Sequence, residues 1–443
     1  MLLNPFNLYL PPHCSEGSPM SVGDLLEDSL DVCDTSPSDS FTRTQFLFRA
    51  YLMPVTYLFG IVSNSINVIV FSQKTMRSQP VNWFFLVLSL SDLTMLIASF
   101  FVFSVPVYAE VADDVGMART SAILIVWFYP LAQTGLTMSV YLTILVSVHR
   151  FLGVCHPFLI RRVSNSSAVK GVIVSAVAFA FLFNTSRWFE LMAVPCYSKR
   201  HDRESLVVYP TDLMVNSVYT VVYRNAAYTM VMFFLPFATL TFVNLRIIGT
   251  LKSSYKMRRM MTMHPRKKRE GKIAADTVTI SRPETNSNTA TLLAPNSSQP
   301  VNSSGNERKE NGVTVMLMAI TTEFLLFNLL AFANNVLELT GAYGHSQLET
   351  LLVEVSTLLV NINGASTIVI YLIFGSKYRT LFVQLLQRAG IPICTGRKKS
   401  MYTSTPHYET TQLLDSKNEE SRWKSVRSNN VSEVQAKIKQ SRT

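Results

Sequence analysis

Residues 81–106 read VNWFFLVLSLSDLTMLIASFFVFSVP, and Asp92 is the only charged side chain in this run. About 20 apolar residues are enough for an α-helix to cross a bilayer. Comparable apolar runs lie at 48–72, 118–152, 168–192, 224–250, 312–340 and 348–374. No window alternates polar and apolar residues with the two-residue period of a membrane β-barrel. An α-helix, in contrast, satisfies its own backbone hydrogen bonds in lipid. We therefore predict an all-α membrane protein, a seven-transmembrane helix bundle.

The overall composition agrees with a membrane protein. Of the 443 residues, 48% are hydrophobic and only 16% are charged, and the mean hydropathy is +0.23. This excludes a disordered chain, a coiled coil and a collagen-like fibre. The chain has 5 cysteines and no C-x-x-C pair, so a zinc site or a small disulfide-stapled fold is also excluded. No nucleophile and base pair or metal triad is recognisable, and we expect no enzyme and no catalytic cofactor.

The net charge of +11 is distributed unevenly. Residues 1–47 hold seven acidic residues and one arginine, a balance of −6, whereas residues 375–443 hold 13 basic and 5 acidic residues, a balance of +8. Basic residues also occupy the connections after the first, third and fifth runs. They include Lys74, Arg77, Arg161, Arg162, Lys170, Arg258, Arg259 and Arg266 to Arg269. Because basic loops stay in the cytoplasm, we predict an extracellular amino terminus and a cytoplasmic carboxyl terminus. The positive charge therefore indicates orientation, and we expect no nucleic acid partner.

The remaining segments are polar. Residues 1–47 read as an extracellular acidic segment without a removable signal peptide, and 48–374 as the bundle. The connection at 251–311 is rich in Ser, Thr and Asn and contains four prolines, so we predict a disordered cytoplasmic loop. Residues 391–443 read as a disordered cytoplasmic tail.

The third run ends in Arg150-Phe151-Leu152-Gly153-Val154-Cys155-His156-Pro157. This sequence resembles the end of helix three in rhodopsin-like G-protein-coupled receptors. Matching positions elsewhere are Asn64, Asn82, Leu86, Ser89, Asp92, Leu93, Pro236 and Tyr371. The resemblance covers roughly 48–388. It implies a multi-pass plasma-membrane receptor that activates heterotrimeric G proteins, and a short amphipathic helix 8 over 375–390 on the lipid surface.

A narrower resemblance rests on the third, fourth and fifth runs. They contain Tyr129-Pro130-Leu131-Ala132-Gln133-Thr134-Gly135 and Phe183-Asn184-Thr185-Ser186-Arg187-Trp188-Phe189-Glu190, followed by Tyr219, Tyr223 and Asn244. Together these are similar to invertebrate FMRFamide-type neuropeptide receptors, whose ligands are short amidated peptides ending in Arg-Phe-amide. An amine ligand is disfavoured because Ala132 replaces the expected aspartate, and retinal because 351–374 contains no lysine.

The predicted ligand contacts combine acids and aromatic side chains. A carboxylate can hold an arginine guanidinium of the ligand by two parallel hydrogen bonds. The predicted contacts are Tyr129, Gln133, Glu190, Glu338 and Glu354, with Tyr219 and Tyr223 at the rim. Glu190 and Glu338 could equally be solvated residues at helix ends.

The chain departs from the receptor pattern at its switch. The resemblance assigns the G-protein switch to Arg150, Phe151 and Tyr371, but His149 stands where an acid usually precedes the arginine. We therefore expect raised ligand-independent activity.

Helix six retains only Phe324 of the usual F-x-x-C-W-x-P, and in helix seven Thr367-Ile368 replaces the usual Asn-Pro. An alternative is therefore a receptor-like protein that binds ligand or partners without activating G proteins. A receptor for another ligand class is a further alternative; a transporter is disfavoured because no inverted repeat is detectable.

Asp92 is an intramembrane acid and therefore costly unless neutralised. By resemblance, Ser139 and Asn363 would join it in a sodium site, and a water-filled hydrogen-bond network is the alternative.

The cysteines leave the disulfide pattern open. Cys14, Cys33 and Cys196 are the extracellular candidates, so one of the three is left over. We favour a bridge between Cys196 and Cys33, and a bridge between Cys14 and Cys33 is the alternative. Cys394 follows an amphipathic stretch and is a candidate for palmitoylation. Tail hydroxyls such as Ser400 and Thr403 lie beside basic residues, so receptor kinases and arrestin are expected partners.

Overall fold

Seven helices of the computed structural model are long and apolar enough to cross a membrane. The structure describes residues 41–163, 165–198, 201–263, 303–339 and 347–390. The candidate spans are Arg43–Phe71, Val81–Ala112, Val115–Cys155, Ser166–Phe189, Ser217–Ser254, Thr314–Glu338 and Gln347–Phe374. The predicted seven-helix bundle is confirmed. All of these helices belong to one compact unit, which ends at Leu385.

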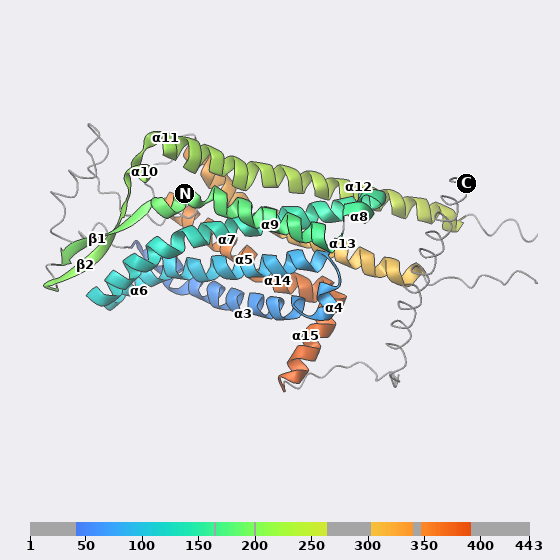
Figure 1. Cartoon of the computed structure of the whole chain (residues 1–443), viewed down its shortest axis with the longest axis horizontal. Coiled ribbons are helices and arrows are strands. Elements are labelled where there is room, and N and C mark those ends of the chain that lie inside the picture. Colours follow the sequence, from blue (N-terminus) through green and yellow to red (C-terminus); the bar gives the residue numbers. More distant parts are fainter. Residues whose placement is uncertain (1–40, 164, 199–200, 264–302, 340–346, 391–443) are drawn as a thin grey trace, which may run out of the picture. The chain divides into compact units, whose positions relative to one another are not determined.

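The long helices run along one another in a bundle (Figure 1), and several are built from more than one segment. The first comprises α2 (Arg43–Leu47), η2 (Phe48–Leu52) and α3 (Met53–Phe71); the second α5 (Val81–Ser99), η3 (Phe100–Ser104) and α6 (Val105–Ala112); the third is α7 (Val115–Cys155). The fourth comprises α9 (Ser166–Phe183) and η4 (Thr185–Phe189); the fifth α11 (Ser217–Tyr219), η5 (Thr220–Ala227), η6 (Met230–Phe234) and α12 (Leu235–Met263); α13 (Ser303–Leu339) and α14 (Gln347–Phe374) follow. Short connecting helices are α4 (Lys74–Arg77), α8 (Pro157–Val163) and α10 (Asp212–Val215).

The outward surface of these helices is apolar. Large side chains such as Val55, Leu58 and Leu182 are 70%, 68% and 76% exposed. The interior holds buried polar groups, including Asn64 and Asp92. Apolar residues outside and polar groups inside are expected of a helix bundle whose solvent is lipid.

Helical structure extends into two segments that were predicted to lie outside the membrane-spanning helices. The first helix begins at Arg43, where Thr42 and Gln45 form a reciprocal capping box, rather than at residue 48. Within the predicted disordered loop, α12 continues to Met263 and α13 starts at Ser303. The helix-breaking prolines of this loop lie only from 265 to 300, so 251–263 and 303–311 can remain helical. The rest of the loop is outside the described residues.

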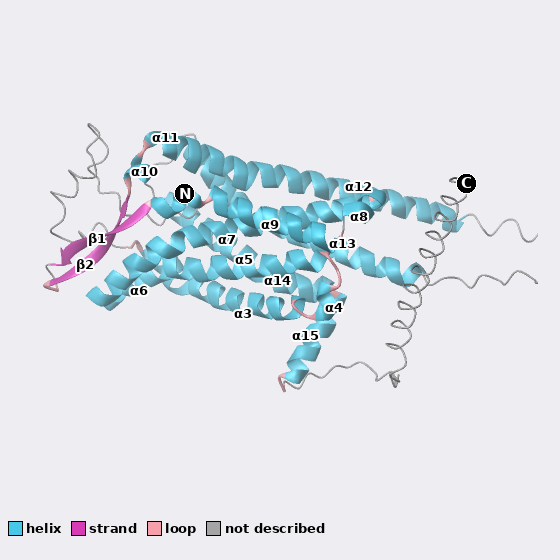
Figure 2. Cartoon of the chain, in the orientation of Figure 1, coloured by secondary structure: helices cyan, strands magenta, loops and turns pink. Residues whose placement is uncertain are grey.

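A β-hairpin at one end of the bundle was not predicted (Figure 2). It consists of β1 (Leu191–Ser198) and β2 (Arg203–Pro210), which pair antiparallel with Leu191 opposite Pro210. β2 packs against α7. The Thr211 amide donates to the Glu190 carbonyl at 2.9 Å, which closes the base of the hairpin. We call this end of the bundle the hairpin end.

The opposite end carries α15 (Ser376–Arg388), at the place expected for helix 8. The Tyr378 hydroxyl of α15 donates to Asn67 Oδ1 at 2.6 Å. The Asn67 amide in turn lies within hydrogen-bond distance of Asn64 Oδ1 and Thr367 Oγ1, at 3.3 and 3.4 Å. These contacts join α15 to α3 and α14. We call this the α15 end; the lipid contact of α15 stays a prediction.

Candidate functional site

Glu190 is the centre of a buried polar cluster at the hairpin end. It follows the 3₁₀ turn η4, and its side chain is fully buried. Its Oε2 accepts hydrogen bonds from the Tyr129 hydroxyl at 2.9 Å and from Arg187 Nη1 at 3.4 Å. Its Oε1 accepts from the Tyr219 hydroxyl at 2.7 Å and lies 3.9 Å from Arg224 Nε. We refer to Tyr129, Arg187, Glu190, Tyr219 and Arg224 as the Glu190 cluster.

Arg187 connects this cluster to three tyrosines. Its Nη1 donates to Tyr129 Oη at 2.8 Å. Its guanidinium carbon lies 5.2 Å from the ring centroid of Tyr228 and 5.5 Å from that of Tyr223, which is within the range of a cation–π contact. The Tyr223 hydroxyl donates to the Phe183 carbonyl. Helices three, four and five therefore meet at one guanidinium.

Helix five reaches this place through two π-helical segments. Pro236 has no backbone N–H and cannot complete the ordinary helical ladder, and η6 lies directly before it. η5 carries Tyr223 and Arg224. Such insertions change which side chains face the bundle and are common at functional sites.

The sequence identified part of this cluster. Tyr129, Glu190 and Tyr219 were predicted ligand contacts, and the structure brings them together, with Tyr223 beside them. Arg187 and Arg224 were missed as site residues. Two signals could have identified them: Arg187 and Glu190 are three residues apart, which places both on one face of a helical turn, and Arg224 is a charged residue within an apolar span.

A small cavity lies in the core next to the cluster. Its lining residues are Leu136, Val140, Tyr228, Met232, Phe233, Asn328, Thr357 and Val360. They come from α7, α13, α14 and the fifth helix, and Asn328 belongs to the region where the helix-six motif was expected. Tyr228 both lines this cavity and contacts Arg187.

Two other predicted ligand contacts, Gln133 and Glu338, are not part of the Glu190 cluster. Gln133 is buried on α7, one helical turn after Tyr129. Glu338 is half-buried near the end of α13. Their ligand contacts stay predictions.

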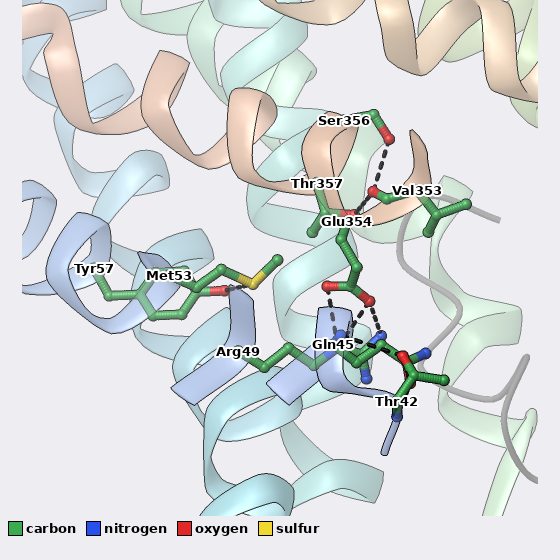
Figure 3. Close-up of polar contacts among 9 residues, drawn as sticks. All are labelled: Thr42, Gln45, Arg49, Met53, Tyr57, Val353, Glu354, Ser356 and Thr357. Atoms are coloured by element: carbon green, nitrogen blue, oxygen red, sulfur yellow. Dashed lines mark hydrogen bonds and ion pairs between the residues drawn. The ribbon is translucent and has the colours of Figure 1, made fainter. Parts of the chain in front are cut away.

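Glu354 forms an ion pair with Arg49 (Figure 3). Arg49 Nη2 lies 2.5 Å from Glu354 Oε1, and Arg49 Nε lies 3.0 and 3.2 Å from the two carboxylate oxygens. The Arg49 guanidinium also lies 5.4 Å from the Phe103 ring centroid. The pair joins helices one and seven, and both side chains are buried. Because the chain itself supplies a guanidinium to Glu354, a ligand arginine would have to displace Arg49; this contact stays a prediction.

The predicted switch residues lie toward the α15 end. Tyr371 is fully buried, and its ring centroid lies 5.1 Å from Phe71 and 5.4 Å from Phe85 and Tyr378. Its hydroxyl has no hydrogen-bond partner within the described part of the chain.

The residues around the predicted Arg150 switch pack against other aromatic side chains. The His149 ring lies 5.7 Å from Phe84, and the Phe151 ring 6.2 Å from Phe242. His149 and Arg150 are both half-buried.

A family comparison agrees with this architecture. Residues 63–367 match the model of the 7 transmembrane receptor (rhodopsin family). The chain belongs to the rhodopsin family of seven-transmembrane receptors. It is therefore a multi-pass membrane receptor by family, and the family is one of receptors rather than enzymes.

Several curated relatives of this receptor are similar over most of its length. A FMRFamide receptor of Drosophila melanogaster is 24% identical over 343 residues, 77% of this chain and 54% of the fly protein. The FMRFamide peptide receptor frpr-18 of Caenorhabditis elegans is 27% identical over 75% of this chain and 68% of its own. The probable G-protein coupled receptor frpr-1 of the same nematode is 22% identical over 74% and 76%. The chain thus spans about half the length of the fly relative.

Asp92 of this receptor is buried on α5, where it faces α7. The Ser139 hydroxyl donates to Asp92 Oδ1 at 2.6 Å, and Oδ2 has no hydrogen-bond partner within the described residues. Gly364 lies beside the carboxylate, since a Cβ built there would be 3.7 Å from Asp92 Oδ1. Asn363 is half-buried, and its backbone carbonyl lies 3.5 Å from Ser366 Oγ. The carboxylate and the Ser139 hydroxyl offer oxygen ligands of the kind that sodium accepts, whereas Gly364 contributes no side-chain ligand. Sodium binding stays a prediction.

Close approach of two helices places Asp92 opposite Ser139. A Cβ at Gly135 would lie 2.9 Å from the Met95 backbone nitrogen and 3.1 Å from the Ser91 carbonyl oxygen. Backbone atoms cannot move aside as a flexible side chain can, so only glycine permits this contact between α7 and α5.

Of the cysteines in the described residues, Cys155 is free and Cys196 of β1 is disulfide-bonded. Cys14 and Cys33, its two candidate partners, and the lipidation candidate Cys394 lie outside the described residues. The choice of Cys33 stays a prediction, as does palmitoylation.

Proposed function

We propose that this receptor recognises an extracellular neuropeptide, a short amidated peptide of the Arg-Phe-amide type, and activates heterotrimeric G proteins. The observation that carries the proposal is the match, over three-quarters of the chain, to two proteins named as FMRFamide receptors. The aromatic Glu190 cluster at the hairpin end supports the proposal, because it offers buried polar groups to a residue of the peptide. No single residue of the chain identifies the peptide.

Ligand binding and the G-protein switch would occur at opposite ends of the bundle. A ligand can shift a two-state bundle only by binding one state more tightly than the other. Peptide binding between the third, fifth and seventh helices would favour a state in which α13 moves and opens the surface around Arg150. Such a movement must alter the contact between Asn244 of α12 and Thr321 of α13. The Asn244 side-chain amide donates a hydrogen bond to Thr321 Oγ1 at 2.8 Å.

We also propose the orientation and the intracellular partners. The hairpin end would be extracellular and the α15 end cytoplasmic, because the basic residues of the connections gather on the latter side. The tail would carry phosphorylation sites for receptor kinases and bind arrestin. A sodium ion at Asp92 and Ser139 would stabilise the resting bundle by compensating the buried carboxylate.

Nucleotide exchange tests the proposed activity. The receptor is placed in lipid nanodiscs with a panel of heterotrimeric G proteins, and binding of labelled GTP analogue is measured on addition of Arg-Phe-amide peptides. We expect amidated peptides to accelerate exchange and their free-acid forms to be much weaker. Arg150→Gln should abolish exchange while retaining peptide binding. A response to another ligand class with none to any Arg-Phe-amide peptide would contradict the ligand assignment.

A second candidate is a receptor that binds its peptide without activating G proteins. It is favoured by Asn328, Leu330 and Thr367, which replace the usual tryptophan and proline of helix six and the asparagine of helix seven. Saturable peptide binding with no exchange on any G protein of the panel would favour this candidate.

A further inference from the structure

The Glu190 cluster has more positive charge and more hydrogen-bond donors than the described part of the chain satisfies. Arg187 and Arg224 contribute two guanidinium groups, and Glu190 contributes the one carboxylate that they both approach. Arg187 is 4% exposed and Glu190 is fully buried, while the Arg224 side chain is 11% exposed. An uncompensated buried charge is costly, and buried ions in proteins are normally paired.

Three buried donors of this region have no acceptor within the described part of the chain. They are Arg187 Nε, Arg224 Nε and the Tyr228 hydroxyl. The two arginines flank Glu190, and Tyr228 lies against the Arg187 guanidinium with its ring 5.2 Å away. A buried donor without an acceptor loses hydration without compensation, which costs about 1–3 kcal/mol per group.

Both oxygens of Glu190 are already engaged. Oε2 accepts from Tyr129 and Arg187, and Oε1 accepts from Tyr219 and faces Arg224. An arginine of the ligand would therefore compete with two internal guanidinium groups for one carboxylate. The expectation that Glu190 pairs directly with a ligand arginine does not follow from this geometry.

We propose that Arg187, Arg224 and Tyr228 form a subsite for a carboxylate of the peptide ligand, such as an aspartate or glutamate side chain. A carboxylate supplies acceptors for the three unpaired donors and compensates the second guanidinium. Tyr228 lines the core cavity, so this acid would be bound where the ligand meets the bundle interior. The inference rests on the proposed peptide function and adds the chemistry of one ligand residue.

A peptide panel tests the subsite on the full-length receptor in nanodiscs. Heptapeptides ending in Arg-Phe-amide carry a single Glu, Gln or Lys at each earlier position in turn, and a second set has Ala in place of both terminal residues. Affinity is measured by competition with a labelled member of the panel. We expect that at one position Glu binds roughly tenfold to a hundredfold more tightly than Gln, as for a charge-assisted hydrogen bond, and that Lys binds more weakly still.

Receptor variants locate the effect. Arg224→Gln and the isosteric Tyr228→Phe should each bring the Glu-to-Gln affinity ratio toward one. Tyr141→Phe is the matched control, because the Tyr141 hydroxyl already donates to the Val231 carbonyl at 3.0 Å; its ratio should remain that of the unmodified receptor. Cell-surface expression separates misfolding of Arg224→Gln from loss of the subsite.

The outcomes separate this inference from the proposed function. Equal affinity of Glu and Gln peptides at every position would overturn the carboxylate subsite while leaving the Arg-Phe-amide assignment intact. If Glu-containing peptides bind from the set that lacks Arg-Phe-amide and no peptide binds from the set that has it, the Arg-Phe-amide assignment is overturned and the carboxylate subsite is supported. If no peptide of either set binds, both fail.

Discussion

Two buried ion-pair sites at the hairpin end are balanced in different ways. Arg49 and Glu354 pair one to one, with three contacts between guanidinium and carboxylate from 2.5 to 3.2 Å. In the Glu190 cluster two arginines approach one carboxylate, and the Nε of each arginine lacks an acceptor within the described residues. The first arrangement is complete within the chain and joins two helices. The second is incomplete within the described residues, which agrees with the proposed carboxylate subsite.

The largest effect is expected at the balanced pair. Glu354→Gln leaves Arg49 as a buried charge without its carboxylate, so the free energy of unfolding should fall by about 3–5 kcal/mol. Thermal unfolding of the purified receptor in detergent measures the loss. Glu110→Gln, at an exposed position in α6, is the matched control and should change stability by less than about 0.5 kcal/mol.

A double substitution at Arg49 and Glu354 tests whether the loss of stability comes from the unpaired charge or from the changed side-chain shape. Arg49→Met combined with Glu354→Leu removes both charges and should regain most of the stability that either single change loses. An additive loss in the double variant would contradict the account of a mutually compensating pair.

A smaller effect is expected from Arg187→Met in the cluster. Glu190 would keep its hydrogen bonds from Tyr129 and Tyr219 and its neighbour Arg224, so the carboxylate is not stranded. We expect a loss of about 2 kcal/mol, measured as above, and a lower cost than for Arg49→Met. If Arg187→Met costs as much as Arg49→Met, the two sites do not differ in the way described.

Tyr219→Phe removes one donor to Glu190 Oε1. The side chain is half-buried, and Arg224 remains near the same oxygen. The expected loss in the free energy of unfolding is about 1 kcal/mol. No measurable change in a thermal scan, with normal peptide affinity, would mean that this hydrogen bond is replaced by water.

Arg150 offers a third case, an arginine preceded by His149 instead of an acid. His149→Asp adds a carboxylate next to the guanidinium and should favour the resting state by about 1 kcal/mol, which is roughly a fivefold lower basal exchange rate. Ligand-independent nucleotide exchange in nanodiscs is the measurement. A wild-type receptor with no basal exchange, unchanged by the substitution, would contradict the expectation.

The sequence predicted the bundle because apolar runs such as 81–106 follow directly from bilayer thickness. It did not predict the hairpin, whose strands are short and mix Pro195 and charged residues with apolar ones. Nor did it predict that α12 would reach Met263, because polar composition alone does not distinguish a solvated helix from a loop.

The candidate site was only partly accessible from sequence. The pair of Arg187 and Glu190 lies within one local motif, so its i, i+3 spacing could have revealed it. Arg49 and Glu354 are 305 residues apart, and no local pattern joins them. Sequence also showed that Glu190 and Glu354 are acids within apolar runs, but whether an acid is free for a ligand depends on guanidinium groups brought by other helices.

Photo-crosslinking tests most directly where the ligand binds. In one receptor benzoylphenylalanine replaces Tyr219 of the Glu190 cluster. In a second it replaces Phe41, whose ring lies 5.6 Å from the Arg49 guanidinium. Each receptor is irradiated with a labelled Arg-Phe-amide peptide that carries the acid at the position found in the peptide panel. The account predicts covalent capture at Tyr219, suppressed by unlabelled peptide, and little at Phe41. Capture at Phe41 with none at Tyr219 would contradict it.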